Sequence, residues 1–109
     1  MRIAVRTSAG LPPALARLAR RRLEFALGRF DNRVRSLAVH LTDVNGPRGG
    51  VDKKCLVTIR LDAPKPLIVI EDTDADAAVA IDRAADRAAW AVARALHTLA
   101  DWRSIRLEY

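Results

Sequence analysis

The stretch between residues 74 and 99 constrains the fold more than any other part of the sequence. Its apolar residues recur every three or four positions, the period that gathers side chains on one face of an α-helix. They are Ala78, Ile81, Ala85, Ala88, Val92, Ala95 and Leu99. A second line with the same spacing runs along the opposite side and consists of Arg83, Arg87, Trp90, Arg94 and His97. The sequence therefore predicts a helix with one face for a core and a cationic face for a partner.

Polar residues mark the expected start of this helix. Thr73 or Asp74 can cap the first free backbone N–H groups, and Asp76 lies where the helix dipole favours negative charge. Alanine fills much of the interior, which favours helix formation and allows a close approach to a sheet.

Length and composition limit the classes of protein to which this chain can belong. The chain of 109 residues suffices for one two-layer domain, residues 1–109, with a single core. No apolar run approaches the ~20 residues that cross a bilayer. Residues 1–10 lack the apolar segment of a secretory signal, and a lone cysteine cannot form an internal disulfide. We therefore expect a soluble cytoplasmic protein that does not associate with a membrane.

The charge balance favours one kind of partner. Nineteen Lys and Arg against thirteen Asp and Glu leave a net charge of +6, and sixteen of the nineteen cations are Arg. Arginine binds phosphate through a planar fork and stacks on bases, so the composition favours nucleic acid over an acidic small molecule. A high-GC genome would also enrich Arg and Ala without regard to function, and this alternative stays open.

The N-terminal third predicts a strand and a helix. Residues 2–7 alternate apolar and polar side chains, as in a strand covered on one side. Two prolines then open a helix predicted over residues 12–28. Its core line is Ala16, Ala19, Leu23, Ala26 or Leu27, and Phe30. Three consecutive arginines, Arg20, Arg21 and Arg22, fan around its exposed half.

Alternating patterns predict three more strands before the long helix, over residues 35–42, 53–61 and 67–70. Turns are expected at residues 31–33, 43–50 and 62–66. The sequence thus predicts an α+β fold of order β-α-β-β-β-α, a two-layer sandwich in which two helices cover one face of a four-stranded sheet. Short connections make the last three strands an antiparallel meander. The other face of the sheet should present Arg2, Arg6, Thr58 and Arg60 to solvent, and residues 100–109 should form a loosely ordered tail or a short turn.

The residues that carry a family resemblance are distributed along the chain. They are RFDNRVRSLAVHL at 29–41, DVNGPRGGVDKKCLVTIRL at 43–61, and Ala80, Ile81, Asp82, Asp86 and Arg87 in the last helix. With the element order, they resemble the ribosome hibernation promoting factor and ribosome-associated inhibitor family, also called the sigma-54 modulation family. The resemblance implies a fold similar to double-stranded-RNA-binding domains and binding to 16S rRNA of the small ribosomal subunit near the decoding centre. There the factor occupies tRNA and mRNA positions and silences idle ribosomes. With one domain, the chain resembles the short forms of this family.

Basic helix faces are the candidate RNA-binding surface. The candidate residues are Arg17, Arg20, Arg21, Arg22, Arg83, Arg87, Trp90 and Arg94. Phosphate contacts from arginine set the affinity and make it salt-dependent, whereas A-form RNA is recognised by shape. The alternative is that these charges form a solvated face with weak ion pairs. Trp90 can stack on a base or cover a helix–helix seam as peripheral core, and the sequence favours the seam.

Other chemistry has little support in the sequence. His40 and His97 fall on different elements without metal-ligand spacing, and Cys55 alternates with core residues as a small buried hydrophobe. Asp72, Asp74 and Asp76 lack the rest of a calcium loop and are interpreted as turn and cap residues. We expect no metal, cofactor, small-molecule substrate or enzyme activity.

Three hypotheses remain open at this point. The first is a ribosome-binding translation silencer. The second is a general RNA-binding module of the same fold, favoured by fewer cations in the last helix than the family pattern has. The third is a protein-interaction or regulatory domain that uses a sheet edge or the surfaces around Trp90 and Trp102. The sequence does not decide whether strand edges pair two copies.

Overall fold

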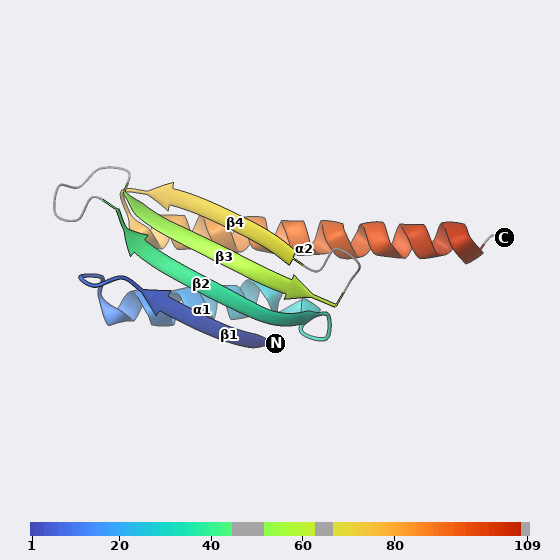
Figure 1. Ribbon diagram of the computed structural model, residues 1–109, viewed down its shortest axis with the longest axis horizontal. Coiled ribbons are helices and arrows are strands. Elements are labelled where there is room, and N and C mark those ends of the chain that lie inside the picture. Colours follow the sequence, from blue (N-terminus) through green and yellow to red (C-terminus); the bar gives the residue numbers. More distant parts are fainter. Residues whose placement is uncertain (45–51, 63–66, 108–109) are drawn as a thin grey trace.

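A computed structural model describes residues 1–44, 52–62 and 67–107 of the chain. The elements, in order, are β1 (Arg2–Thr7), α1 (Pro13–Leu27), the single 3-10 turn η1 (Gly28–Phe30), β2 (Val34–Asp43), β3 (Lys53–Leu61), β4 (Leu67–Asp74) and α2 (Ala77–Leu107). Figure 1 shows both helices on one face of the sheet. The predicted order and the two-layer arrangement are confirmed.

The four strands form one mixed sheet in the order β1-β2-β3-β4. β1 pairs with β2 in parallel, and α1 makes the crossover that a parallel pair requires. The pairs β2–β3 and β3–β4 are antiparallel, so the predicted meander is confirmed. The register aligns Val5 with Val39, Val39 with Val57, and Val57 with Ile70. One apolar row therefore crosses the whole sheet on the face that the helices cover.

The core lies between this face and the two helices. From α1 it takes Ala19, Leu23 and Leu27, and from β2 and β3 the inward residues of the predicted alternation. The fully buried residues of α2 include Ala84, Ala85 and Ala88. Because these side chains are small, α2 packs close to β3 and β4. The opposite face of the sheet, which we call the open face, carries the exposed side chains of Arg2, Arg6 and Arg60 and the half-buried Thr58, as predicted.

β4 is longer than predicted and continues to Asp74 rather than ending at Ile70. The apolar alternation stops at Glu71, but the ladder with β3 continues to the pair Lys53 and Asp74. A salt bridge of 3.8 Å between Lys54 Nζ and Glu71 Oε1 also joins the polar ends of the two strands. Cross-strand partners thus extend a strand whose own sequence predicts a turn.

α2 begins at Ala77, later than predicted, and Asp76 rather than Thr73 or Asp74 caps it. The backbone N–H of Ala78 donates to Asp76 Oδ1 at 2.9 Å, whereas Asp74 Oδ1 accepts the N–H of Asp76 at 2.9 Å. These two contacts confirm the interpretation of Asp74 and Asp76 as turn and cap residues. For Asp72 it is wrong, because Asp72 lies within β4 and pairs with Cys55.

The end of α2 also differs from the prediction. The helix runs past the expected end at Leu99 to Leu107 and extends beyond the sheet (Figure 1). Over residues 101–107 the expected tail or short turn is therefore wrong, because a helix that is already nucleated propagates with one hydrogen bond per added residue and needs no apolar period. The predicted turns at 43–50 and 62–66 fall largely on residues 45–51 and 63–66, which lie outside the described residues. No described helix has the length and apolarity to span a membrane.

Candidate nucleic-acid interface

The cations of α1 form the most positive segment of the helical layer. Residues 13–30 contain five Arg and one Glu. Arg17, Arg20 and Arg21, here called the α1 cation cluster, are all exposed. The buried residues of α1, Leu23 among them, point to the sheet, so the cluster occupies the outer side of the helix. This arrangement presents three guanidinium groups to solvent on one element.

Arg22, the fourth predicted cation of α1, has a partner within the protein. Its Nε lies 2.7 Å from Asp82 Oδ1 on α2, with both side chains partly exposed. The N–H does not align with the oxygen as in a hydrogen bond, so the contact is an ion pair. Arg22 therefore links the two helices, and its charge is partly neutralised by Asp82.

On α2, Arg83 and Arg87 are held by the carboxylates of β4. Arg83 Nε donates to Asp72 Oδ1 at 3.0 Å and its Nη2 to Asp74 Oδ2 at 2.9 Å. Arg87 Nη1 lies 3.3 Å from Asp72 Oδ2. We call these four residues the β4–α2 clamp. Two arginines thus face two carboxylates. The N-terminal half of the cationic face that the sequence predicts for this helix therefore carries little net charge.

Backbone groups complete the β4–α2 clamp. Arg83 Nη2 donates to the carbonyl oxygen of Thr73, and Arg87 Nη1 donates to that of Glu71, both at 2.7 Å. The pKa of Asp74 is lowered first by the N–H of Asp76 and then by the positive charge of Arg83. The two guanidinium groups therefore donate hydrogen bonds to backbone carbonyls at the end of β4 and also neutralise its carboxylates.

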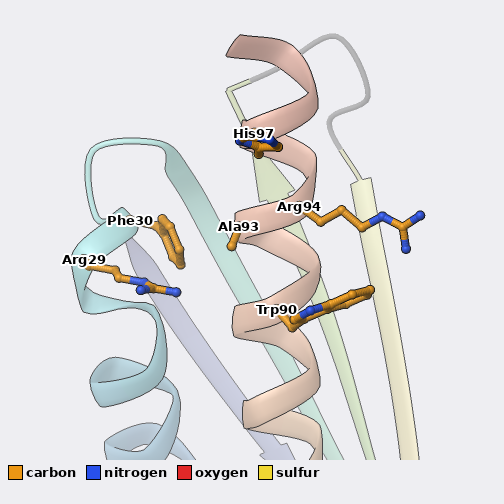
Figure 2. Close-up of a pocket in the computed structure, with 6 residues that line it drawn as sticks. All are labelled: Arg29, Phe30, Trp90, Ala93, Arg94 and His97. Atoms are coloured by element: carbon orange, nitrogen blue, oxygen red, sulfur yellow. The ribbon is translucent and has the colours of Figure 1, made fainter. Parts of the chain in front are cut away.

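Trp90 and Arg94 lie further along α2, beyond the β4–α2 clamp. Trp90 is 65% exposed, and the guanidinium carbon of Arg94 lies 5.1 Å from the centroid of its ring. The interpretation of Trp90 as peripheral core is wrong. Ala88 and Val92 face the core, and a residue midway between them in sequence points to the opposite side of a helix. The indole and the guanidinium project to the same side of α2 (Figure 2).

An open hollow lies between η1 and α2. Its lining consists of Arg29, Phe30, Trp90, Ala93, Arg94 and His97. Figure 2 shows Arg29 and Phe30 reaching from η1 towards α2. The guanidinium carbon of Arg29 lies 4.6 Å from the centroid of Phe30. The hollow combines cations, which suit phosphates, with aromatic faces, which suit bases.

The predicted set omits four residues of this hollow, Ala93 and three with polar or aromatic side chains. Phe30 is predicted only as core, although it is half-buried, and His97 only as an ordinary surface histidine. Arg29 has no periodic signal, because it lies in the 3-10 turn after α1. A cation adjacent to an aromatic residue at a helix end is the one sequence signal that points to this place.

A further exposed aromatic side chain lies on α1. Phe25 is 85% exposed. It is two residues from both Leu23 and Leu27, which are buried, and so it points directly away from the core. This position between two core residues is a signal that the sequence contains and the predicted set omits.

The remaining candidate residues show no catalytic arrangement among the described residues. Cys55 is 1% exposed, as predicted, and burial raises the pKa of its thiol to about 12, with a smaller contribution from the charge of Asp72. His40 is exposed on the open face of the sheet, whereas His97 lies on α2, which covers the opposite face. Within residues 1–44, 52–62 and 67–107, no group of three His, Cys, Asp or Glu side chains is suited to hold a metal ion.

Comparisons with known proteins agree with this architecture. Residues 8–99 match the family described as sigma-54 modulation protein/S30EA ribosomal protein. A ribosomal subunit interface protein from Coxiella burnetii shares the fold, with a TM-score of 0.67, 14% identity, and coverage of 86% of this chain and 96% of that chain. The N-terminal domain of Protein Y from Thermus thermophilus has a TM-score of 0.62 and 28% identity, over 86% of this chain and 98% of that chain. A search of curated proteins finds no significant match.

Proposed function

Because the chain belongs to the sigma-54 modulation protein/S30EA ribosomal protein family, whose members are ribosome-associated factors, we propose that it binds 16S rRNA of the small ribosomal subunit near the decoding centre and silences translation in the cytoplasm. The observation that carries this proposal is the exposed α1 cation cluster. Glu24 is the only acidic residue of α1, which carries four arginines, so the helix has a net positive charge.

Phosphate contact is the main source of affinity in this proposal. Arg17, Arg20 and Arg21 bind phosphates of folded rRNA, and Arg94 and Trp90 extend the contact onto α2. Each phosphate that a cation neutralises releases counterions, so binding weakens as salt increases. Shape rather than sequence guides recognition, because the major groove of A-form RNA is too narrow for side chains to read.

Arg22, Arg83 and Arg87 contribute less to RNA binding in this proposal than their charge implies. Each already lies within 3.3 Å of a carboxylate oxygen. An RNA phosphate would have to replace that carboxylate, so the gain in Coulomb energy is the difference between two similar contacts. Their main role is to fix the helices against each other and against β4.

A general RNA-binding module is the second candidate function, and the β4–α2 clamp favours it. With Arg83 and Arg87 paired, α2 offers fewer cations for a dedicated ribosomal site. Such a module would bind isolated RNA duplexes as tightly as small subunits. A silencer would prefer the subunit.

Co-sedimentation with 30S and 70S particles at low and high salt tests the proposal. The test variant changes Arg17, Arg20 and Arg21 to Ala. The matched control changes Arg2, Arg6 and Arg60 to Ala, which removes the same charge from the open face. We expect saturable binding that high salt weakens, that the α1 variant loses and that the control retains. Bound wild-type protein should also lower the yield of an in vitro translation reaction.

Two outcomes contradict this proposal. Equal loss of binding in both triple variants would mean that net charge rather than the α1 face governs association. Salt-sensitive binding to RNA duplexes without preference for 30S particles would favour the general RNA-binding module instead.

A further inference from the structure

Phe25 is the most exposed large hydrophobic side chain among the described residues, at 85%. Its Cβ points away from the core, because the neighbouring positions Leu23 and Leu27 are both buried. No rotamer can return a ring to the core from the opposite side of a helix. Among the residues that the structure describes, none covers this apolar surface, and the ring faces water.

Two cations precede this ring along the outer side of α1. Arg17, Arg21 and Phe25 are spaced four residues apart, and residues so spaced on a helix are stacked about 6 Å apart along its axis. Arg29 follows in η1, where its guanidinium group lies over Phe30. The aromatic ring thus lies between the exposed arginines of α1 and the hollow beside α2.

We propose that Phe25 stacks on an unpaired nucleobase of the RNA that the α1 face binds. This inference rests on the proposed function and adds the kind of RNA that the site takes. Arg17 and Arg21 hold the phosphates on the N-terminal side of that nucleotide, and Arg29 holds those on the other side. Because every base has a π-face, the contact selects an exposed base rather than a particular sequence.

The charge around Phe25 distinguishes RNA from an apolar protein partner. A protein that covered the ring with its own hydrophobic surface would also cover Arg21, and desolvating an unpaired cation is costly. An RNA strand supplies both the flat apolar surface and the negative charge. A fully paired duplex does not, since its base faces are stacked inside the helix. The site therefore favours single-stranded, bulged or loop RNA.

The test measures binding of 30S particles, of oligoadenylate and of an RNA duplex of the same length. The variants are Phe25→Ala and Phe25→Trp, with Val69→Ala as the control that shortens an exposed apolar side chain on the open face. We expect Phe25→Ala to bind oligoadenylate about 5- to 150-fold more weakly, the usual effect of losing one stacked base. Phe25→Trp should retain binding, and Val69→Ala should not change it.

An abasic nucleotide in the oligoadenylate gives an independent readout. The abasic site is placed at each position of the oligoadenylate in turn. At one position it should weaken binding by wild-type protein. At that same position it should not weaken binding by Phe25→Ala any further. Such non-additivity is the signature of two groups that contact each other. A folding defect in the variant would instead reduce the binding of every RNA, the duplex included.

The outcomes separate this inference from the proposed function. One outcome is that wild-type protein binds 30S particles and that Phe25→Ala binds both oligoadenylate and 30S particles as tightly as wild type does. The stacking inference is then wrong and the proposed function stands. If wild-type protein binds neither 30S particles nor any RNA, both are wrong. Equal weakening of duplex and oligoadenylate by Phe25→Ala would also overturn the inference, because the ring would then act through the helix rather than on a base.

Discussion

The carboxylate of Asp72 on β4 contacts the guanidinium of Arg83 on α2, with Oδ1 3.0 Å from both Nε and Nη2. The second oxygen of Asp72 contacts Arg87, so one carboxylate is shared by two cations. The Asp72 side chain is 12% exposed, whereas the guanidinium-bearing side chains are about half exposed. This relationship joins the last strand to the last helix and removes positive charge from the surface that the sequence predicts to be cationic.

Replacing Asp72 by Asn should lower stability and strengthen RNA binding. The change removes one negative charge from the β4–α2 clamp and leaves Arg83 and Arg87 available to phosphates. We expect a loss of about 1 kcal/mol in the free energy of unfolding, at the low end for charge-assisted hydrogen bonds because the guanidinium groups are half exposed. Urea denaturation and RNA binding across a salt series measure the two effects. The salt dependence should become steeper, because additional phosphates are contacted.

Glu71→Gln is the control for this prediction. It removes the same charge from the next residue of β4, whose side chain faces Lys54 across the open face at 3.8 Å. An exposed pair at this distance contributes little to stability. If Asp72→Asn bound RNA no more tightly than Glu71→Gln does, the clamp would not limit the cations of α2.

Truncating Trp90 should weaken RNA binding without destabilising the fold. The ring is 65% exposed, so Trp90→Ala removes little buried area, and the free energy of unfolding should change by less than about 0.5 kcal/mol. Binding should weaken by about 1–3 kcal/mol if the indole stacks on a base. Trp90→Phe, which keeps an aromatic face, should restore most of the affinity. A large loss of stability in Trp90→Ala would contradict this prediction, because it would mean that the indole contributes to packing.

The pKa of Asp74 predicts an acid-dependent loss of stability. Its folded-state pKa is lowered from 3.8, first by the N–H of Asp76 and then by Arg83. A carboxyl whose folded-state pKa is lowered stabilises the protein above its unfolded-state pKa, and the contribution disappears as the pH falls through the folded-state pKa. We therefore expect Asp74→Asn to be less stable at neutral pH and to lose less stability than wild type below about pH 4. Urea midpoints measured against pH test this.

Asp86→Asn removes the same charge from an exposed position of α2 and serves as the control for the pH series. Parallel stability curves for wild type and Asp74→Asn across the acid range would contradict the prediction. They would mean that the contacts of Asp74 do not distinguish its charged form from its neutral form.

Thiol labelling should report global unfolding through Cys55. Burial raises the pKa of this thiol to about 12, compared with 9.0 for an exposed thiol, so the reactive thiolate is scarce in the folded protein. With a single cysteine in the chain, every label marks this site. We expect slow labelling of native protein near neutral pH and rapid labelling in urea. Rapid labelling of native protein, at the rate of a free thiol, would mean that β3 opens locally.

Local periodicity was enough to predict most of the fold. The alternation in residues 53–61 and the three- and four-residue spacing after residue 78 each arise within one element, so they indicate its type and its buried face. Short connections then limited how the last three strands could pair. Arg17 and Arg21 were predicted as exposed cations for the same local reason, since they lie on the side of the helix away from Leu23, and Arg20 borders that side.

Contacts between elements decided the rest. The pairing of Arg83 and Arg87 with Asp72 depends on how α2 lies beside β4, and no spacing within either element encodes it. Likewise, β4 extends to Asp74 because β3 supplies its hydrogen-bonding partners. The sequence by itself determined which elements form and which faces they bury, because those properties depend on neighbours along the chain. Only the tertiary structure decided which cations remain available to a partner, because a charge is neutralised by whichever carboxylate the fold brings near it.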